Sequence, residues 1–418
     1  MRTSAKITTG VAGLALVAGG VYAVPRLLDD GGRPAAAQRL GGGAPEPGRS
    51  GAITPPGGRP FTLVATGDII PYPSIIERSA LDAGGDGHDF RKILGGVKAV
   101  VSAADMAVCH HEIPYGEPGG PYTGYPTFKA PHELADALKD TGYDSCSTAS
   151  NHTLDAGYPG LARTLDHLDR VGIKHSGSAR GAAEATTPVL FEAGGAKVAQ
   201  LSYTYGTNGI PVPEGKPWSV NLIDQRRIIA DARAARAAGA NVVVLSVHWG
   251  TEWQTAPNEQ QLELARALTA SRTEGGPDLD LILGTHNHVP QPYEKVNGTW
   301  VAPTRGGVSK GAAVDDNGTW VIYGMGDQVA GEMFNHTGAR DLRGNMSSLG
   351  RFRFEPPTAQ GQRWRVTKAE FVPLYFDTDA GRVVDLRKAD GVLADVRDEI
   401  SHTVLGRDAG KHGLTIAE

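Results

Sequence analysis

The chain has 418 residues, enough to bury a large core in one large domain or two modest ones. Charged residues make up 21% and hydrophobic residues 40%, a balance typical of globular proteins, and the formal net charge of −5 gives no basic surplus. Because nucleic-acid binders usually carry such a surplus, no nucleic-acid partner is expected.

The first 28 residues have the layout of a signal peptide or a membrane anchor. Arg2 and Lys6 precede an uncharged stretch over residues 7–24, which is about the minimum length for a membrane span and is diluted by glycines. Cleavage after Ala23 and retention as an uncleaved anchor both remain open. Residues 29–60 are rich in Gly, Pro and Ala and are expected to form a disordered linker. We therefore expect an exported protein, either anchored to the membrane and facing outwards or secreted.

From residue 61 onward, six short apolar runs each end in side chains that bind metals or transfer protons. In chain order these side chains are Asp68; His110, His111 and Glu112; Asn151, His152 and Asp155; His248 and Glu252; His286 and His288; and Asp327. Helical periodicity over 131–140, 158–171, 224–239 and 258–271 lies between the runs. This alternation predicts parallel strands with helical crossovers, which would bring the strand-end residues together along one rim.

Carboxylates, neutral imidazoles and an amide oxygen form a ligand set suited to Mn, Zn or Fe. His286 and His288 alternate, so in an extended segment both rings point the same way and offer nitrogens to adjacent ions. The repetition of such groups predicts a site for one or two divalent metals. Two fit better, because a dinuclear centre binds both oxygens of a displaced group and lowers the pKa of a bridging water. Glu252 and Asp327 are expected to support ligand residues rather than to bind metal.

Asn151, His152 and Asp155 lie within five positions and support two interpretations. In one, Asn151 binds metal, His152 protonates a leaving group and Asp155 orients the His152 ring. In the other, Asn151 caps the following helix and His152 only packs. We favour the first, which makes His152 and Asp155 the predicted catalytic residues.

Two cysteines, Cys109 and Cys146, each lie near the end of a predicted strand. A pair of buried free thiols and a disulfide between neighbouring strands are both consistent with the sequence. Spacing along the chain leaves the choice open, because it says nothing about the Cα separation that a bridge requires.

The C-terminal part has a different pattern. From residue 351 on, polar and apolar residues alternate around turn signals, which predicts antiparallel strands that finish a second sheet. We expect residues 356–418 to complete, with strands and a helix, the domain that residues 61–355 begin. Their role is expected to be structural.

These residues resemble the CapA family of capsule-synthesis or poly-γ-glutamate-synthesis proteins, which share the calcineurin-like metallophosphoesterase fold. The resemblance covers residues 61–355 and rests on the motifs TGDII, HHEIP, SNHTLDAG, HWGTEW and GTHNHVPQ. It implies an α/β fold in which two β-sheets pack as a sandwich flanked by helices, an αββα arrangement. It also implies a metal site, made of Asp68, Glu112, Asn151, His248, His286 and His288.

Three positions depart from the family pattern. His110 stands where the family usually has asparagine, and Asp327 also replaces a usual asparagine. Ile70 occupies the place of a histidine found in related phosphoesterases, so one metal site is short of a ligand. That site is weak, differently occupied, or completed by His110 or His111.

The leading hypothesis is an exported or membrane-tethered CapA-like protein with a divalent-metal site. It would act in the synthesis, transport or processing of an anionic capsule polymer such as poly-γ-glutamate, as a metal-dependent hydrolase. The expected partners are that polymer or a phosphoester substrate, other capsule-synthesis membrane proteins, and the membrane if the N-terminal segment stays uncleaved. One alternative is a non-catalytic subunit for polymer binding or assembly. Another is a secreted metallophosphoesterase unrelated to capsule.

Overall fold

The computed structural model describes residues 58–273, 276–297, 318–359 and 361–418. The signal peptide or anchor predicted for residues 1–28 lies outside these ranges, as does nearly all of the linker predicted for residues 29–60. Among the described residues, no helix combines the length and the apolar character that crossing a membrane requires.

The first sheet mixes parallel and antiparallel strands. Its strand order is β16-β15-β14-β1-β2-β3-β4, and two short strands pair at its side, β13 with β1 and β17 with β15. The parallel part consists of β1 (Phe61–Ile69), β2 (Met106–His111), β3 (Ser145–Ser147), β4 (Lys174–Ser176) and β13 (Asp327–Val329). The part after residue 345 consists of β14 (Met346–Glu355), β15 (Arg365–Asp377), β16 (Arg382–Asp385) and β17 (Leu414–Ile416).

The second sheet has the strand order β11-β12-β10-β7-β6-β5. Its strands are β5 (Val189–Ala193), β6 (Ala196–Thr204), β7 (Val242–His248), β10 (Leu281–Thr285), β11 (Tyr293–Val296) and β12 (Thr319–Ile322). β6, β7, β10 and β12 run parallel to one another, whereas β5 and β11 are antiparallel edge strands. A separate two-stranded ribbon joins β8 (Arg272–Thr273) to β9 (Gly276–Pro277).

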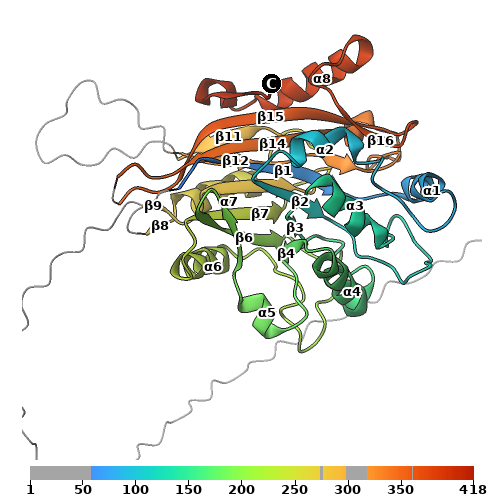
Figure 1. Cartoon of the computed structure of the whole chain (residues 1–418), viewed down its shortest axis with the longest axis horizontal. Helices are drawn as coiled ribbons and strands as arrows, with labels where there is room; N and C mark the ends of the chain where they lie inside the picture. Colours follow the sequence, from blue (N-terminus) through green and yellow to red (C-terminus); the bar gives the residue numbers. More distant parts are fainter. Residues whose placement is uncertain (1–57, 274–275, 298–317, 360) are drawn as a thin grey trace, which may run out of the picture. The chain divides into compact units, whose positions relative to one another are not determined.

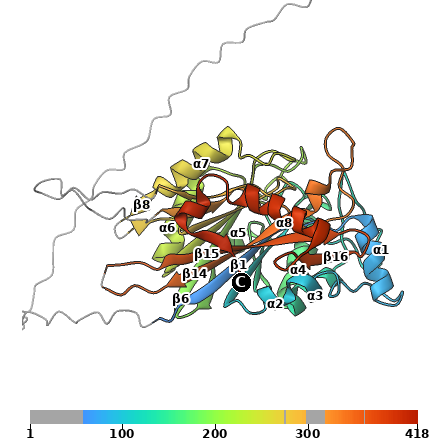
Figure 2. The same ribbon diagram turned by 90° about the horizontal axis from the view of Figure 1, so that it is seen from above.

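Helices cover the outer faces of the two sheets (Figure 1). The first sheet carries α1 (Pro73–Asp82), α2 (Gly95–Val101), α3 (Glu133–Thr141) and α4 (Gly157–Arg170), and the second carries α6 (Gln225–Ala237) and α7 (Glu259–Ala270). α8 (Gly391–Val404) lies over β15, as the view from above shows (Figure 2). The remaining helical turns are α5 (Ala182–Thr186), η1 (Leu342–Asn345) and η2 (Ala409–His412).

The alternation of side chains along the strands produces this layering. In β1, Val64 packs with the helices, whereas Leu63 and Ala65 pack between the two sheets. The predicted α/β fold with an αββα sandwich is therefore confirmed. The four predicted helices correspond to α3, α4, α6 and α7, with ends within two residues of the predicted ones.

The C-terminal strands require a correction. β14, β15 and β16 are antiparallel, as predicted, but β14 pairs with β1 from Phe61 to Ala65. The tail therefore extends the first sheet and does not finish a separate second sheet. The reason is that the parallel series β1-β2-β3-β4 leaves one edge of β1 unpaired, and β14 satisfies the backbone groups of that edge.

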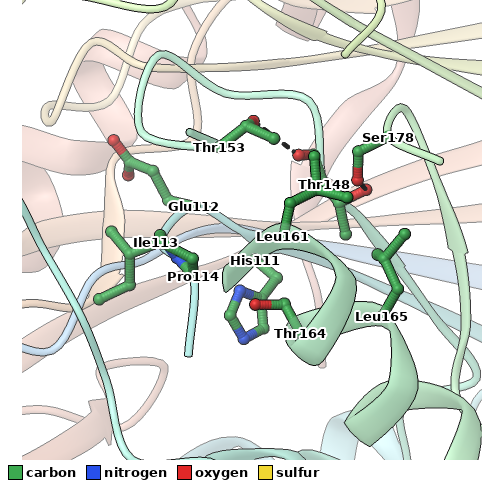
Figure 3. A pocket seen from close by; sticks show the side chains of 10 residues that line it. All are labelled: His111, Glu112, Ile113, Pro114, Thr148, Thr153, Leu161, Thr164, Leu165 and Ser178. Atoms are coloured by element: carbon green, nitrogen blue, oxygen red, sulfur yellow. Dashed lines mark hydrogen bonds between the residues drawn. The ribbon is translucent and has the colours of Figure 1, made fainter. Parts of the chain in front are cut away.

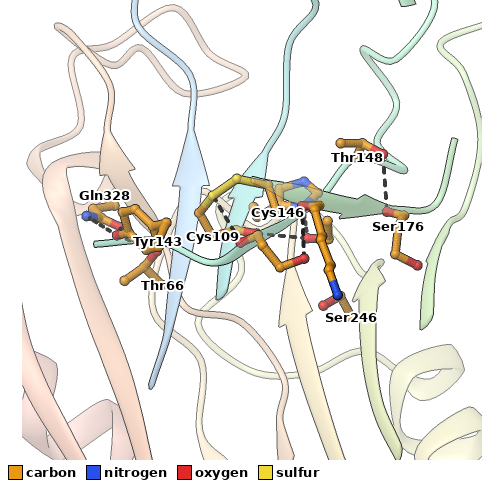
Figure 4. The surroundings of a disulfide bond; sticks show 12 residues. Thr66, Cys109, Tyr143, Cys146, Thr148, Ser176, Ser246 and Gln328 are labelled. Carbon is orange, nitrogen blue, oxygen red and sulfur yellow. Dashed lines mark hydrogen bonds between the residues drawn. A yellow bond between two sulfur atoms is a disulfide. The ribbon is translucent and has the colours of Figure 1, made fainter. Parts of the chain in front are cut away.

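A disulfide joins Cys109 of β2 to Cys146 of β3, which answers the question that the sequence left open (Figure 4). The two residues are direct register partners on adjacent parallel strands, and their Cα atoms are 4.5 Å apart. Next to the bridge, the Tyr143 hydroxyl lies 3.0 Å from Thr66 Oγ1. The bridge therefore ties the strand that contains His110 to the strand that leads into the Asn151 loop.

Candidate metal centre

The predicted site residues lie at the carboxyl ends of strands from both sheets. β1 ends just after Asp68, and the sheet register pairs Asp68 with His110 of β2 and with Asp327 of β13. In the second sheet, His248 ends β7 and pairs with Thr285 at the end of β10. The alternation of strands and helices predicted that these residues would meet along one rim. They come instead from the strand ends of two sheets, because the strands are divided between two sheets.

One group of side chains is rich in carboxylates. Ligand atoms of Asp68, Glu112, His288 and Asp327 lie within 4.8 Å of one another, and all four residues are buried. Burial raises the pKa of Asp68 well above its ordinary value, and the charge of Asp327 raises it further. Burial likewise raises the pKa of Glu112, with the charge of Asp68 adding to the effect. The three carboxyl groups therefore lack enough positive charge around them.

Asp327 was expected to play a supporting role, and it lies within this group. Its carboxylate is 2.9 Å from His288 Nδ1. Burial alone would lower the pKa of His288, but the charge and hydrogen bond of Asp327 raise it well above the ordinary value. Without a bound metal, the carboxylates therefore favour the charged form of the His288 imidazole.

A second group shares Asp68 and is rich in imidazoles. Ligand atoms of Asp68, His110 and His248 also lie within 4.8 Å of one another, with His110 Nε2 3.7 Å from Asp68 Oδ1. The His248 ring lies 4.7 Å from the rings of both His110 and His286. Burial lowers the pKa of His248 and of His286, and burial lowers that of His110 to about 3, so all three rings stay neutral. Neutral imidazoles are the form that binds metals.

Hydroxyl groups orient the imidazoles. Ser147 Oγ lies 2.8 Å from His110 Nδ1, and Thr285 Oγ1 lies 3.0 Å from His248 Nδ1. Each contact leaves the Nε2 atom of the ring for the centre, which is the usual arrangement of a metal-binding histidine and its supporting partner. Sequence reasoning missed both hydroxyl residues, because each lies 37 residues from its histidine.

The donor atoms of this centre fit a divalent metal because several have no other partner. Within the described part of the chain, Asp68 Oδ1, His110 Nε2, both carboxylate oxygens of Glu112 and His286 Nδ1 are buried without a hydrogen-bond partner. Buried polar atoms are nearly always paired, so this concentration of unpaired acceptors is unusual. Carboxylate oxygens and imidazole nitrogens are also the donors that Zn²⁺, Mn²⁺ and Fe²⁺ accept. We name these residues, with His248, His288 and Asp327, the Asp68 cluster.

Asn151 contacts the Asp68 cluster. Its Oδ1 lies 2.8 Å from His248 Nε2. The alternative interpretation, in which Asn151 caps the following helix, is wrong, because α4 begins at Gly157 with Ala156 in the capping position. Asn151 ends up five residues upstream of that position, at the edge of the cluster.

His152 and Asp155 make the contact that the sequence predicted. His152 Nδ1 lies 2.6 Å from Asp155 Oδ2, and the same oxygen accepts a hydrogen bond of 2.7 Å from the backbone N–H of Phe128. The Phe128 ring packs edge-on against the His152 ring at 4.9 Å. Asp155 is thus held in place by the backbone and fixes His152, whose Nε2 remains available.

His110 and His111 face opposite directions, as successive strand residues do. His110 belongs to the Asp68 cluster, whereas His111 lines a small pocket beside α4 with Thr148, Leu161 and Thr164 (Figure 3). Figure 3 also shows the Glu112 side chain directed away from His111. Of the two candidates for the missing ligand, the structure brings His110 to the centre and leaves His111 outside it.

The exposed rim of the centre contains Tyr205 and Glu252. Glu252 Oε1 lies 4.0 Å from His288 Nε2, and the Glu252 side chain is 45% exposed, so it lies at the mouth rather than among the buried ligands. The Tyr205 ring lies 4.5 Å from the His286 ring and is also exposed.

A further group of acidic and imidazole side chains lies elsewhere. Asp169, His175 and Glu184 have ligand atoms within 4.8 Å of one another. Arg180 already occupies this group, since it forms ion pairs with Asp169 and Glu184 and with neighbouring Asp166. We name these residues the Arg180 cluster.

The two sheets packed as a sandwich, with buried acidic, amide and imidazole groups at their strand ends, define an α/β protein with a candidate metal centre. The sequence profile of the family described as bacterial capsule synthesis protein PGA_cap matches residues 62–332. Since this match covers more than half of the chain, the protein belongs to the PGA_cap family.

The curated relatives include proteins named for PGA biosynthesis and for polyglutamine synthesis. The chain is 29% identical over 169 residues to the PGA biosynthesis protein CapA of Bacillus subtilis, which covers 40% of this chain and 42% of that protein. It is 27% identical over 163 residues to a probable polyglutamine synthesis accessory protein of Mycobacterium tuberculosis, with 37% and 41% covered. The matches thus span about two fifths of each relative's length.

Solved structures with a similar chain trace include phosphoesterases. The calcineurin-like phosphoesterase YfkN of Bacillus subtilis is 16% identical with a TM-score of 0.42, covering 82% of this chain and 97% of that one. A putative 5'-nucleotidase from Staphylococcus aureus is 14% identical with a TM-score of 0.46, covering 82% and 58%. None of these likenesses, at TM-scores below 0.5, extends an activity to this chain.

Proposed function

We propose that this chain is an exported, divalent-metal-dependent hydrolase that acts on an anionic polymer of the cell envelope, with poly-γ-glutamate as the leading substrate. The observation that carries the proposal is the set of buried, unpaired donors that converge on Asp68. Membership of the PGA_cap family and the names of the curated relatives support the choice of substrate.

The residues of the centre would have two roles, metal binding and proton transfer. The metals would be held by Asp68, His110, Glu112, Asn151, His248, His286, His288 and Asp327. A bound divalent metal would act as a Lewis acid and would neutralise an anionic substrate. His152 would carry a proton on Nε2 and give it to the leaving group, while Asp155 holds the ring through Nδ1.

Replacement of His152 tests the hydrolase proposal. His152→Gln removes the proton donor and keeps the side chains of all the proposed metal ligands. We expect turnover of poly-γ-glutamate or of a generic phosphodiester to fall by roughly 10²–10⁴-fold, with metal content unchanged. His402→Gln, at an exposed position on α8, is the matched control and should retain activity. Equal turnover of both variants and the wild type would contradict the role of His152.

A second candidate function is a metal-containing subunit that binds the polymer without cleaving it. The feature that favours it is Ile70, a buried hydrocarbon side chain in the place where related phosphoesterases have a histidine. Metal bound at full occupancy, polymer bound and neither substrate turned over would support this candidate. Cleavage of the phosphodiester alone would instead favour a phosphoesterase unrelated to capsule.

Export is a separate part of the proposal and rests on the residues before the folded part. The charged start and the uncharged stretch over residues 7–24 support it. Added protease should digest the full-length chain in intact cells if it faces outwards, and a secreted form should appear in the medium. Protection of the chain until the cells are lysed would contradict export.

A further inference from the structure

A tight turn lies beside the candidate metal centre. Residues 207–210 read Thr-Asn-Gly-Ile, and Asn-Gly is the preferred central pair of a type I′ turn. Both central residues have positive φ, 49° at Asn208 and 77° at Gly209. The N–H of Ile210 donates to the carbonyl of Thr207 at 2.9 Å, and the Thr207 hydroxyl donates to the carbonyl of Ile210 at 2.6 Å. The backbone at Asn208 is therefore well fixed.

The chain just before the turn is attached to the centre. The N–H of Tyr205 donates to the carbonyl of His248 at 3.0 Å. From the turn, the Asn208 side chain accepts two hydrogen bonds on its Oδ1, one from Asn151 Nδ2 at 3.3 Å and one from the Tyr205 hydroxyl at 3.4 Å. Asn208 is an exposed residue, and these two hydrogen bonds connect its side chain to the centre.

The contact with Asn208 matters because the two ends of the Asn151 amide have the same shape and opposite chemistry. The oxygen end lies 2.8 Å from His248 Nε2 and has lone pairs for a cation. A rotation of the amide by half a turn would present N–H donors instead, which cannot bind a metal. Asn208 Oδ1 is an acceptor, so it pairs with the nitrogen end of Asn151 and repels the oxygen end.

We propose that Asn208 is a positioning residue that fixes the Asn151 amide with its oxygen towards the centre. This inference rests on the metal binding in the proposed function and extends it to a residue outside the ligand set. Besides the Tyr205 hydroxyl, Asn208 contacts the amide nitrogen of Asn151 rather than its ligand oxygen, so it acts on metal binding by orienting that amide. The strength of metal binding then depends on a turn of the loop that follows β6.

Two substitutions at this position separate the side chain from the backbone. Asn208→Gly keeps the positive φ without strain and removes the acceptor. Asn208→Asp tolerates the same φ and retains an acceptor oxygen at the same place. In titrations of the full chain with Mn²⁺ or Zn²⁺, we expect affinity to fall by roughly 10–100-fold in Asn208→Gly, the usual cost of losing a supporting contact. Asn208→Asp should retain wild-type affinity or exceed it.

A structural measurement provides the second arm. In crystals of the metal-free protein at atomic resolution, the Asn151 amide should have one orientation in the wild type and in Asn208→Asp, and two in Asn208→Gly. Wild-type affinity together with a single amide orientation in Asn208→Gly would overturn the inference. This outcome differs from failure of the hydrolase proposal, which would be metal binding by the wild type without turnover.

Discussion

The Asp68 cluster and the Arg180 cluster both bring carboxylate and imidazole ligand atoms within 4.8 Å of one another, yet they balance charge differently. In the Arg180 cluster, a guanidinium forms ion pairs with the acids, and its hydrogen bonds hold the pKa of Glu184 below the ordinary value against the effect of burial. In the Asp68 cluster, burial and mutual repulsion raise the pKa of Asp68 and of Glu112 instead.

Proximity of ligand atoms does not by itself define a metal site. The Arg180 cluster contains its own cation, and its acids are partly exposed. Water and the Arg180 guanidinium therefore stabilise the negative charges of these carboxylates. The Asp68 cluster is buried and contains acceptors without hydrogen-bond partners. A bound metal cation would therefore offset the free-energy cost of burying these unpaired groups.

The largest effect is expected from Asp68→Asn. Asp68 belongs to both ligand groups of its cluster, so neutralising it weakens both at once. Since losing a mere supporting partner costs 10–100-fold, we expect metal affinity to fall on the order of a hundredfold or more. Elemental analysis of the purified protein measures the result. The same substitution in the other cluster, Asp169→Asn, should leave the metal content at the wild-type level, and equal losses would refute the comparison.

Removal of metal by a chelator should lower the thermal stability of the wild type. At a free metal concentration of one hundred times Kd, one bound ion adds about 3 kcal/mol to the free energy of unfolding. For a chain of this size that is on the order of 5 °C in Tm. Scanning calorimetry with and without chelator gives the difference. Asp68→Asn should show little change on chelation, and a shift equal to that of the wild type would place the metal elsewhere.

The pH dependence of stability in metal-free protein should have opposite signs in the two clusters. Burial raises the folded-state pKa of Glu112, so its favourable contribution is present below about pH 4.5 and is lost as pH rises through the raised pKa. The folded-state pKa of Glu184 is lowered, so its contribution is present above about pH 4.5 and is lost as pH falls.

Chemical denaturation across pH tests these signs with one type of substitution. Relative to metal-free wild type, Glu112→Gln should become more stabilising as pH rises from about 4.5 to 8, whereas the destabilisation by Glu184→Gln should be nearly constant above about pH 4.5 and should shrink as pH falls below it. The same sign for both variants would show that the clusters do not differ in charge balance.

The smallest effect is expected from removing the internal cation of the Arg180 cluster. Arg180→Gln leaves Asp169, His175 and Glu184 with their ligand atoms already close together. We expect the variant to acquire weak, single-site binding of Zn²⁺. Titration calorimetry in an Asp68→Asn background, where metal binding by the main centre is weakened, detects it. Equal Zn²⁺ binding by Asp68→Asn and by the Asp68→Asn, Arg180→Gln double variant would contradict the role of Arg180.

The sequence was informative where a property repeats along the chain. Apolar runs that end in ligand-type residues predicted the strand ends that hold Asp68, His248 and His288, and helical periodicity predicted α3, α4, α6 and α7. The Asn-His-x-x-Asp spacing predicted the contact between His152 and Asp155, because three residues are within reach of a local turn.

Contacts that depend on which strands become neighbours were not predictable in this way. Ser147 reaches His110 only because β3 lies beside β2, and β14 joins β1 across nearly three hundred residues. Asn208 was missed although its Asn-Gly pair signals a tight turn, because nothing in that signal indicates that the turn lies against Asn151. The choice between His110 and His111 likewise needed the orientation of β2.

Anomalous X-ray diffraction from crystals of the full chain grown with Mn²⁺ or Zn²⁺ tests the central claim most directly, because one map contains both clusters. We expect a strong metal peak among Asp68, Glu112, His248 and His288, and none beside Arg180. The absence of a peak at the Asp68 cluster, or a peak of equal height between Asp169 and Glu184, would contradict it.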